Sequence, residues 1–128
     1  ENPVFDPNLA TFMDFTVAQK GNTRFMYVLP VSNTRALVEY TLFSEKLLAD
    51  EEYETAIKQF IAELGITRYT IKATEKGAIP MTSYPFERHN SKNIMHIGTA
   101  GGFTRGSTGF TFNYTDKITL RLLWRPTQ

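Results

Sequence analysis

Three runs of β-branched and aromatic residues near the start of the chain constrain its fold more than any other feature. They are Leu9–Val17, Phe25–Leu29 and Arg35–Phe43, and residues of these types favour extended strands. Turn-forming residues separate them, at Gly21-Asn22 and from Pro30 to Asn33. Connections this short make neighbouring strands antiparallel. The sequence therefore predicts an antiparallel meander at the start of the chain.

A helix is predicted after the third strand, from about Glu51 to Leu64. Asp50 is the expected N-cap, and Gly65 is the expected left-handed residue that ends the helix. Five apolar residues recur at helical spacing and are expected to face the sheet: Tyr53, Ile57, Phe60, Ile61 and Leu64. On the opposite face, Glu54 and Lys58 are placed to form an i,i+4 ion pair.

The rest of the chain has weaker patterns. Arg68–Ala73 resembles a fourth strand, Asn93–Ile97 a short apolar strand, and Ile118–Trp124 fits either a helix or a strand. The predicted fold class is α+β: an antiparallel sheet, built from segments around Phe12, Tyr27, Val38 and Ile71, with one main helix packed on it. No repeat or linker divides the 128 residues, so we expect a single domain over 1–128.

Composition excludes several classes of function. The formal net charge is only +1, so nothing steers the whole chain toward nucleic acid. Cysteine is absent, which excludes disulfides and thiolate chemistry. No run of apolar residues is long enough to suggest a membrane-spanning helix. The sequence opens on Glu1 rather than methionine, so we expect a trimmed, processed or partial chain.

Two acids interrupt apolar strands and are the first candidates for chemistry. Glu39 shares a strand face with Leu37 and Thr41, and Asp14 is expected on the same face as Phe12. If that face is dry, desolvation favours the protonated carboxyl group, which suits proton donation to an unreactive substrate. If it is wet, both acids are ordinary solvent-facing strand residues. The sequence leaves both alternatives open.

Other polar features carry less chemistry. Residues 98–109 read GTAGGFTRGSTG, which favours either a loop that approaches a phosphate or a plain glycine turn, and they do not form the GxGxxG motif. His89 and His96 are not spaced as a helical metal pair, so no metal site is expected. Arg24 opens a predicted strand, where a surface base is the expected role.

The chain resembles the flavin-dependent lycopene β-cyclase family. The similar segments are FMDFTV, RFMYVLPVSNTRALVEYTLFS, EKGAIPM and IGTAGGFTRGSTGFTF, in the family's order from about Phe12 to Phe112. The most specific is Tyr27-Val28-Leu29-Pro30 followed by Leu37-Val38-Glu39-Tyr40-Thr41. The resemblance implies the conversion of lycopene ends to β-ionone rings, a non-redox isomerisation, on a substrate domain like that of p-hydroxybenzoate hydroxylase.

The resemblance also implies roles for particular residues. Glu39 matches the family's cyclisation acid and Asp14 a second acid of the family. The C-terminal segment matches the one that closes over the flavin, which makes its small residues cofactor-binding candidates: Gly98, Gly101, Gly102, Ser107, Thr108 and Gly109. The implied cofactor is reduced FAD, with a nicotinamide cofactor as its reductant. Lycopene is the implied substrate, and the implied location is cytoplasmic and peripheral to a membrane.

Three departures from the family's pattern bear on these expectations. The family's N-terminal Rossmann segment is missing, and the tail from Ile118 to Gln128 does not continue the family pattern. Arg105-Gly106 also stands where a lysine and a proline are expected. We therefore expect the substrate-binding part of a larger FAD-dependent cyclase, inactive and without flavin when isolated, and able to self-associate. The rivals are a non-catalytic module that binds apolar ligands and the substrate domain of a flavin monooxygenase.

Overall fold

A computed structural model describes residues 3–124 and divides the chain into two compact units, with the boundary between Thr74 and Glu75. The sequence predicts one domain because no segment of the chain has the composition of a linker. The segment before the boundary is instead an exposed, irregular stretch. Each unit is described below by itself.

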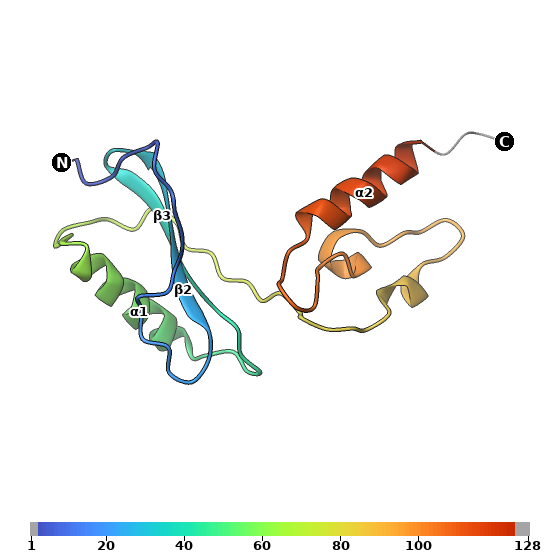
Figure 1. The fold of residues 1–128 in the computed structure, drawn as a ribbon, viewed down its shortest axis with the longest axis horizontal. Coiled ribbons are helices and arrows are strands. Elements are labelled where there is room, and N and C mark those ends of the chain that lie inside the picture. Colours follow the sequence, from blue (N-terminus) through green and yellow to red (C-terminus); the bar gives the residue numbers. More distant parts are fainter. Residues whose placement is uncertain (1–2, 125–128) are drawn as a thin grey trace. The chain divides into compact units, whose positions relative to one another are not determined.

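The first unit is a three-stranded antiparallel sheet with one helix, as expected for an α+β fold. Its strands are β1 (Thr11–Asp14), β2 (Arg24–Ser32) and β3 (Arg35–Leu42), in the order β1-β2-β3. The helix α1 (Asp50–Glu63) lies along one side of the sheet (Figure 1). The predicted meander and the position of the helix are confirmed.

The core lies between α1 and one face of the sheet. Met26, Val28 and Tyr40 of the sheet pack with Phe60 of the helix, and Met26 is fully buried. Of the helical stripe, Tyr53 and Ile57 also pack on this cluster and Ile61 is buried, whereas Leu64 is 44% exposed. Leu64 follows the last helical residue, so its side chain leaves the stripe.

The ends of α1 differ in part from the prediction. Asp50 is not the N-cap but the first helical residue, and Ala49 precedes it without a side-chain capping bond. Asp50 still belongs to an acidic first turn, which the helix dipole favours. Gly65 has a positive φ of 76°, as expected for a residue that ends a helix. Lys58 Nζ lies 2.8 Å from Glu54 Oε2, which confirms the predicted pair.

The bounds of the first two strands of the meander differ from those expected. β2 continues through Pro30 to Ser32, because the register shift between these residues accommodates the proline close to the hairpin turn. β1 is only four residues long. Met13 takes a left-handed φ of 55°, and the next residues form a turn in which the Thr16 backbone N–H donates to Asp14, so the ladder ends there.

The expected fourth strand over Arg68–Ala73 is also wrong. Every residue of this segment is exposed and none belongs to a strand. A strand needs a partner to satisfy its backbone groups, and the structure offers this segment no neighbouring strand. Its apolar alternation was therefore not sufficient to add it to the sheet.

The second unit contains two short 3-10 turns, η1 (Phe86–His89) and η2 (Gly98–Gly101), and the helix α2 (Phe112–Leu123). Phe103 is buried and meets the ring of Tyr114 edge to face at 5.4 Å. The expected strand over Asn93–Ile97 is wrong, since no strand partner is present for it. The tail forms a helix, one of its two alternatives, and residues 125–128 lie outside the described part of the chain.

Candidate functional site

The face of the sheet opposite α1 carries the best candidate site. Strand alternation sends Met26 and Val28 to the core, so Phe25, Tyr27 and Leu29 project from the other side. In the antiparallel register, Tyr27 pairs with Glu39, which therefore shares this helix-free face. The site is thus a sheet surface rather than an enclosed cavity.

A row of aromatic rings covers this surface. Phe12 meets Tyr27 at 5.1 Å between ring centroids, Tyr27 meets Phe25 at 5.3 Å, and Phe25 meets Phe15 at 5.4 Å and Phe43 at 5.9 Å. All four contacts are edge to face, the geometry that aromatic pairs prefer. We call these five residues the aromatic row. Phe25 is buried beneath its neighbours, whereas Phe12 is 66% exposed.

Glu39 is the carboxylate beside this row. Its side chain is exposed, so of the two alternatives drawn from the sequence, the solvent-facing strand residue is the one found in this chain. The Thr41 hydroxyl donates to Glu39 Oε1 at 2.7 Å and so holds the side chain along the strand. Burial, together with the negative charge of Glu39, raises the pKa of Tyr27 above its usual range. Tyr27 therefore remains a neutral phenol.

Asp14 has a different environment. The Thr16 hydroxyl and the Thr16 backbone N–H donate to Asp14 Oδ1 at 2.6 and 2.9 Å. These two bonds hold the pKa of Asp14 below its usual range. Asp14 therefore gives up its proton more readily than an ordinary aspartate.

The two acids do not form a paired site. Asp14 lies on β1 opposite Met26, and Glu39 lies on β3 opposite Tyr27, so β2 runs between them. Two strand spacings separate the outer backbones by about 10 Å. The expected alternation around Asp14 is also wrong, because Phe12 and Phe15 both contact rings of the helix-free face. The left-handed Met13 breaks the alternation between them.

The glycine-rich segment lies in the second unit, and several of its backbone donors are in use. The N–H groups of Gly102, Thr108 and Gly109 donate to carbonyls of the same segment, and that of Gly101 donates to the Ile97 carbonyl just before it. A Cβ at Gly101 would collide with the His96 carbonyl, so packing against the segment's own backbone is sufficient to require this glycine. The segment contains the plain glycine turn that the sequence offered as an alternative.

The remaining candidates in this segment are more open. Gly98 and Gly109 have positive φ angles of 62° and 72°, and a Cβ at either position would meet nothing within 4 Å. Ser107 is exposed, and the Thr108 hydroxyl accepts a 3.4 Å bond from the Phe110 N–H. The role of these residues in binding FAD phosphates stays a prediction.

The two histidines lie near one another in the second unit. The Tyr84 hydroxyl and His89 Nε2 are 2.9 Å apart, and the rings of His89 and His96 meet at 6.4 Å. Among residues 3–124, no group of three or more histidine or acidic side chains is placed to hold a metal ion. Nor does any helix in this part of the chain have the length and apolar character to cross a membrane.

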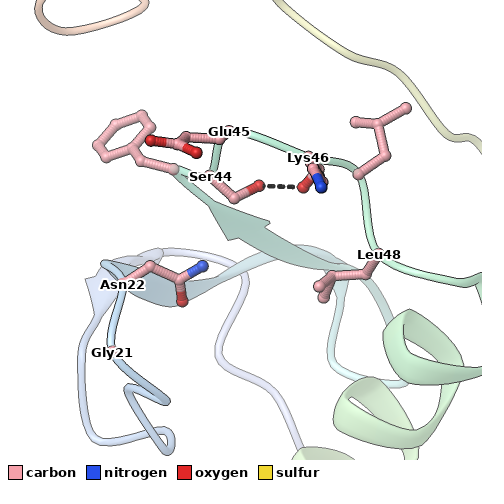
Figure 2. A pocket seen from close by; sticks show the side chains of 8 residues that line it. Gly21, Asn22, Ser44, Glu45, Lys46 and Leu48 are labelled. Carbon is pink, nitrogen blue, oxygen red and sulfur yellow. Dashed lines mark hydrogen bonds between the residues drawn. The ribbon is translucent and has the colours of Figure 1, made fainter.

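A shallow depression at one end of the first unit contains none of the predicted site residues. It lies between the turn at Gly21-Asn22 and the segment from Phe43 to Leu48 (Figure 2).

Arg24 is not the surface base that the sequence predicts, because its side chain is only 5% exposed. Its Nη1 donates to the Tyr40 hydroxyl at 2.9 Å, on the helix side of the sheet.

The aromatic neighbours of Glu39 were not predicted from the sequence. The turn at Asn33-Thr34 pairs Ser32 with Arg35, and a regular ladder from that turn would place Tyr40 opposite Tyr27. The register shift between Pro30 and Ser32 places Glu39 opposite Tyr27 instead. The contact of Phe12 with Tyr27 could not be predicted either, because it depends on the irregular register of β1.

Comparisons with known proteins bear on the family of the chain. The family model described as lycopene cyclase protein matches residues 1–120. The lycopene beta-cyclase of Paracoccus sp. is 29% identical over 111 residues, which cover 83% of this chain and 28% of that protein. The lycopene beta-cyclase of Pantoea ananas is 38% identical over 71 residues, covering 55% of this chain and 19% of that protein.

This chain therefore spans less than a third of the length of either relative. No protein of known structure matches it significantly. The family match extends from the first residue through both acids and the glycine-rich segment to residue 120. The chain belongs to the lycopene cyclase family.

Proposed function

We propose that this chain supplies the substrate-facing acid of a lycopene cyclase and that Glu39 is that acid. The observation that carries the proposal is the position of Glu39 on the helix-free sheet face, beside the aromatic row, in a chain that matches the family over residues 1–120. A polyene has no polar group to grip, so its site needs apolar surface and one proton donor. This face offers both.

The proposed reaction is an isomerisation. The Glu39 carboxyl gives its proton to a terminal double bond of the polyene, which forms a C–H bond and leaves a tertiary carbocation. The neighbouring double bond attacks this cation and closes a six-membered ring. Loss of a proton to a carboxylate then leaves the ring double bond, so no net oxidation or reduction occurs.

Proton donation requires that Glu39 be shielded from water. An apolar polyene laid along the aromatic row would remove water from the carboxyl group and disfavour its charged form. Asp14 keeps its proton less readily than an ordinary aspartate because Thr16 donates to it twice. Because β2 separates Asp14 from Glu39, we assign Asp14 the role of a fixed negative charge that favours the developing cation from a distance, without contact.

The chain is further proposed to act within a longer protein, as the part that corresponds to the substrate domain of p-hydroxybenzoate hydroxylase. Reduced FAD, with a nicotinamide cofactor as its reductant, would be held mainly by segments outside this chain, because several N–H groups of the glycine-rich segment already donate to nearby carbonyls. When bound, the reduced flavin supplies electron-rich stabilisation of positive charge. Lycopene is lipid-soluble, so we propose a cytoplasmic protein peripheral to a membrane.

The test uses the protein at its full natural length, expressed in a bacterium that accumulates lycopene. Glu39→Gln keeps the shape of the side chain and removes the dissociable proton, so cyclised product should fall by about 10²- to 10⁴-fold. Glu54→Gln, which makes the same change on the exposed face of α1, is the matched control and should retain most activity. Product is measured by chromatography, and the flavin content of each purified variant by absorbance.

Near-normal cyclisation by a folded, flavin-loaded Glu39→Gln protein would show that another group donates the proton. Binding of lycopene without any conversion by the wild type would instead favour a non-catalytic module for apolar ligands. Hydroxylated products would indicate a flavin monooxygenase. These outcomes separate the proposed function from both rivals.

A further inference from the structure

We propose that Phe12 and Tyr27 are the cation-stabilising residues of the site, with the rings of the aromatic row facing the carbocation that forms next to Glu39. This inference rests on the proposed function, since it assumes that Glu39 protonates a polyene. It adds the groups that stabilise the product of that protonation until the ring closes.

Register places one of these rings next to the acid. Tyr27 and Glu39 are direct cross-strand partners, whose Cβ atoms lie about 5 Å apart in an antiparallel pair. The influence of Glu39 on the pKa of Tyr27 is a second sign of this proximity. A carbon atom that receives the Glu39 proton therefore lies within reach of the Tyr27 ring.

Phe12 extends the same surface outward. Its ring centroid is 5.1 Å from that of Tyr27, with the two ring planes inclined at 62°. Phe12 is 66% exposed although it belongs to a sheet, so one large apolar ring is left without a covering group. Phe12 of β1 and Glu39 of β3 lie on either side of Tyr27, so the Phe12 ring extends the aromatic surface from Tyr27 away from the acid.

Aromatic rings suit a carbocation better than polar groups do. The face of a ring carries partial negative charge and attracts a cation within about 6 Å of its centroid. Unlike water or a hydroxide, a ring does not readily form a bond that would end the reaction early. Tyr27 keeps its proton, because burial and Glu39 both disfavour the phenolate. A phenolate would be a nucleophile and could trap the cation.

The occupant of this face is therefore the isoprenoid end of a polyene rather than a second protein. Charge complementarity supports this choice: the face combines one carboxylate with π-electron surfaces, which match a hydrocarbon that becomes positive during the reaction. Such a ligand brings no backbone groups that would need partners from the sheet. A second copy of the chain is retained as an outcome of the test.

The test replaces Phe12 with phenylalanines that carry one, two or three ring fluorines, in the full-length protein. Each fluorine withdraws charge from the ring face with little change in size. We expect log kcat to fall steadily with the number of fluorines, to a total loss of about 2- to 30-fold. The same series at Phe60, on the helix side of the sheet, should leave kcat unchanged.

Two variants of Tyr27 complete the test. Tyr27→Phe keeps the ring and should retain kcat within about twofold, whereas Tyr27→Leu removes it and should lower kcat by about 2- to 30-fold. If kcat does not change with the number of fluorines at Phe12, while Glu39→Gln is inactive, this inference is overturned and the proposed function stands. Activity in Glu39→Gln would overturn the proposed function instead.

The oligomeric state of the protein tests whether a second copy of the chain covers this face. If kcat is constant across the fluorine series and the protein is a dimer that dissociates on Phe12→Ser, the face serves protein association and the inference is overturned. A monomeric protein with a sloping series would support it. Gel filtration at several concentrations, run beside the kinetic series, measures this difference.

Discussion

Arg24 and Tyr40 form a buried hydrogen bond whose contribution to stability can be worked from the structure. Arg24 is 5% exposed and Tyr40 is 9% exposed. Arg24 Nη1 donates to the Tyr40 hydroxyl at 2.9 Å, and Nε donates to Asn22 Oδ1 at 2.5 Å. In the described part of the chain, the Arg24 guanidinium forms no salt bridge. A buried charge here depends on neutral hydrogen-bond acceptors alone.

Removing either partner alone should have unequal effects. Tyr40→Phe leaves a charged donor buried without its acceptor, which should lower the free energy of unfolding by about 1.5–3 kcal/mol. Arg24→Met removes the buried charge together with both bonds and leaves only neutral groups, the Tyr40 hydroxyl and the half-buried Asn22 side chain, so it should cost about 1 kcal/mol. The double variant leaves neither group unpaired and should lie within about 1 kcal/mol of the wild type.

The double-mutant cycle should therefore show a coupling energy of about 1–2 kcal/mol. Because the chain has two compact units, a global melting curve would mix their unfolding. Native-state hydrogen exchange at the amides of β2 and β3 reports the opening free energy of the first unit alone. Additive effects, with coupling below about 0.3 kcal/mol, would refute the claim that this bond stabilises the buried arginine.

Two further predictions concern the predicted site residues. Thr16→Val removes the side-chain bond that contributes most to the lowered pKa of Asp14, so that pKa should rise toward its usual range in a carboxyl NMR titration. A lowered folded-state pKa stabilises the protein at pH values above the unfolded pKa of about 4, and this stabilisation is lost as the pH falls. Thr16→Val should therefore reduce the amount of stability that the protein loses below about pH 4. Gly101→Ala should unfold or distort the second unit, since its Cβ would collide with the His96 carbonyl, whereas Gly77→Ala, where a Cβ meets nothing within 4 Å, should not. Circular dichroism compares the two alanine variants, and equal effects would contradict the packing argument.

Local sequence patterns were sufficient for the parts of the fold that are built from neighbours in the chain. The β2–β3 hairpin and α1 lie close to their predicted positions, because alternation, turn residues and helical spacing act over a few residues. The face that holds Glu39 does not follow from this alternation alone, because the register shift between Pro30 and Ser32 sets which β3 residues lie opposite Tyr27. The resemblance to lycopene cyclases also came from sequence alone, through the motif around Glu39, and the family match confirms it.

Only the tertiary structure decided features that depend on partners far along the chain or on irregular backbone. Arg68–Ala73 has a strand pattern but no strand beside it, and pairing cannot be inferred from one strand's own residues. The sequence predicts a surface base at Arg24, whereas in the structure its guanidinium donates to the hydroxyl of Tyr40, sixteen residues along the chain. The left-handed Met13 separated Asp14 from its expected alternation and brought Phe12 and Phe15 to the aromatic row. Periodicity assumes a regular backbone, so a single residue outside the strand region changes which side chains share a face.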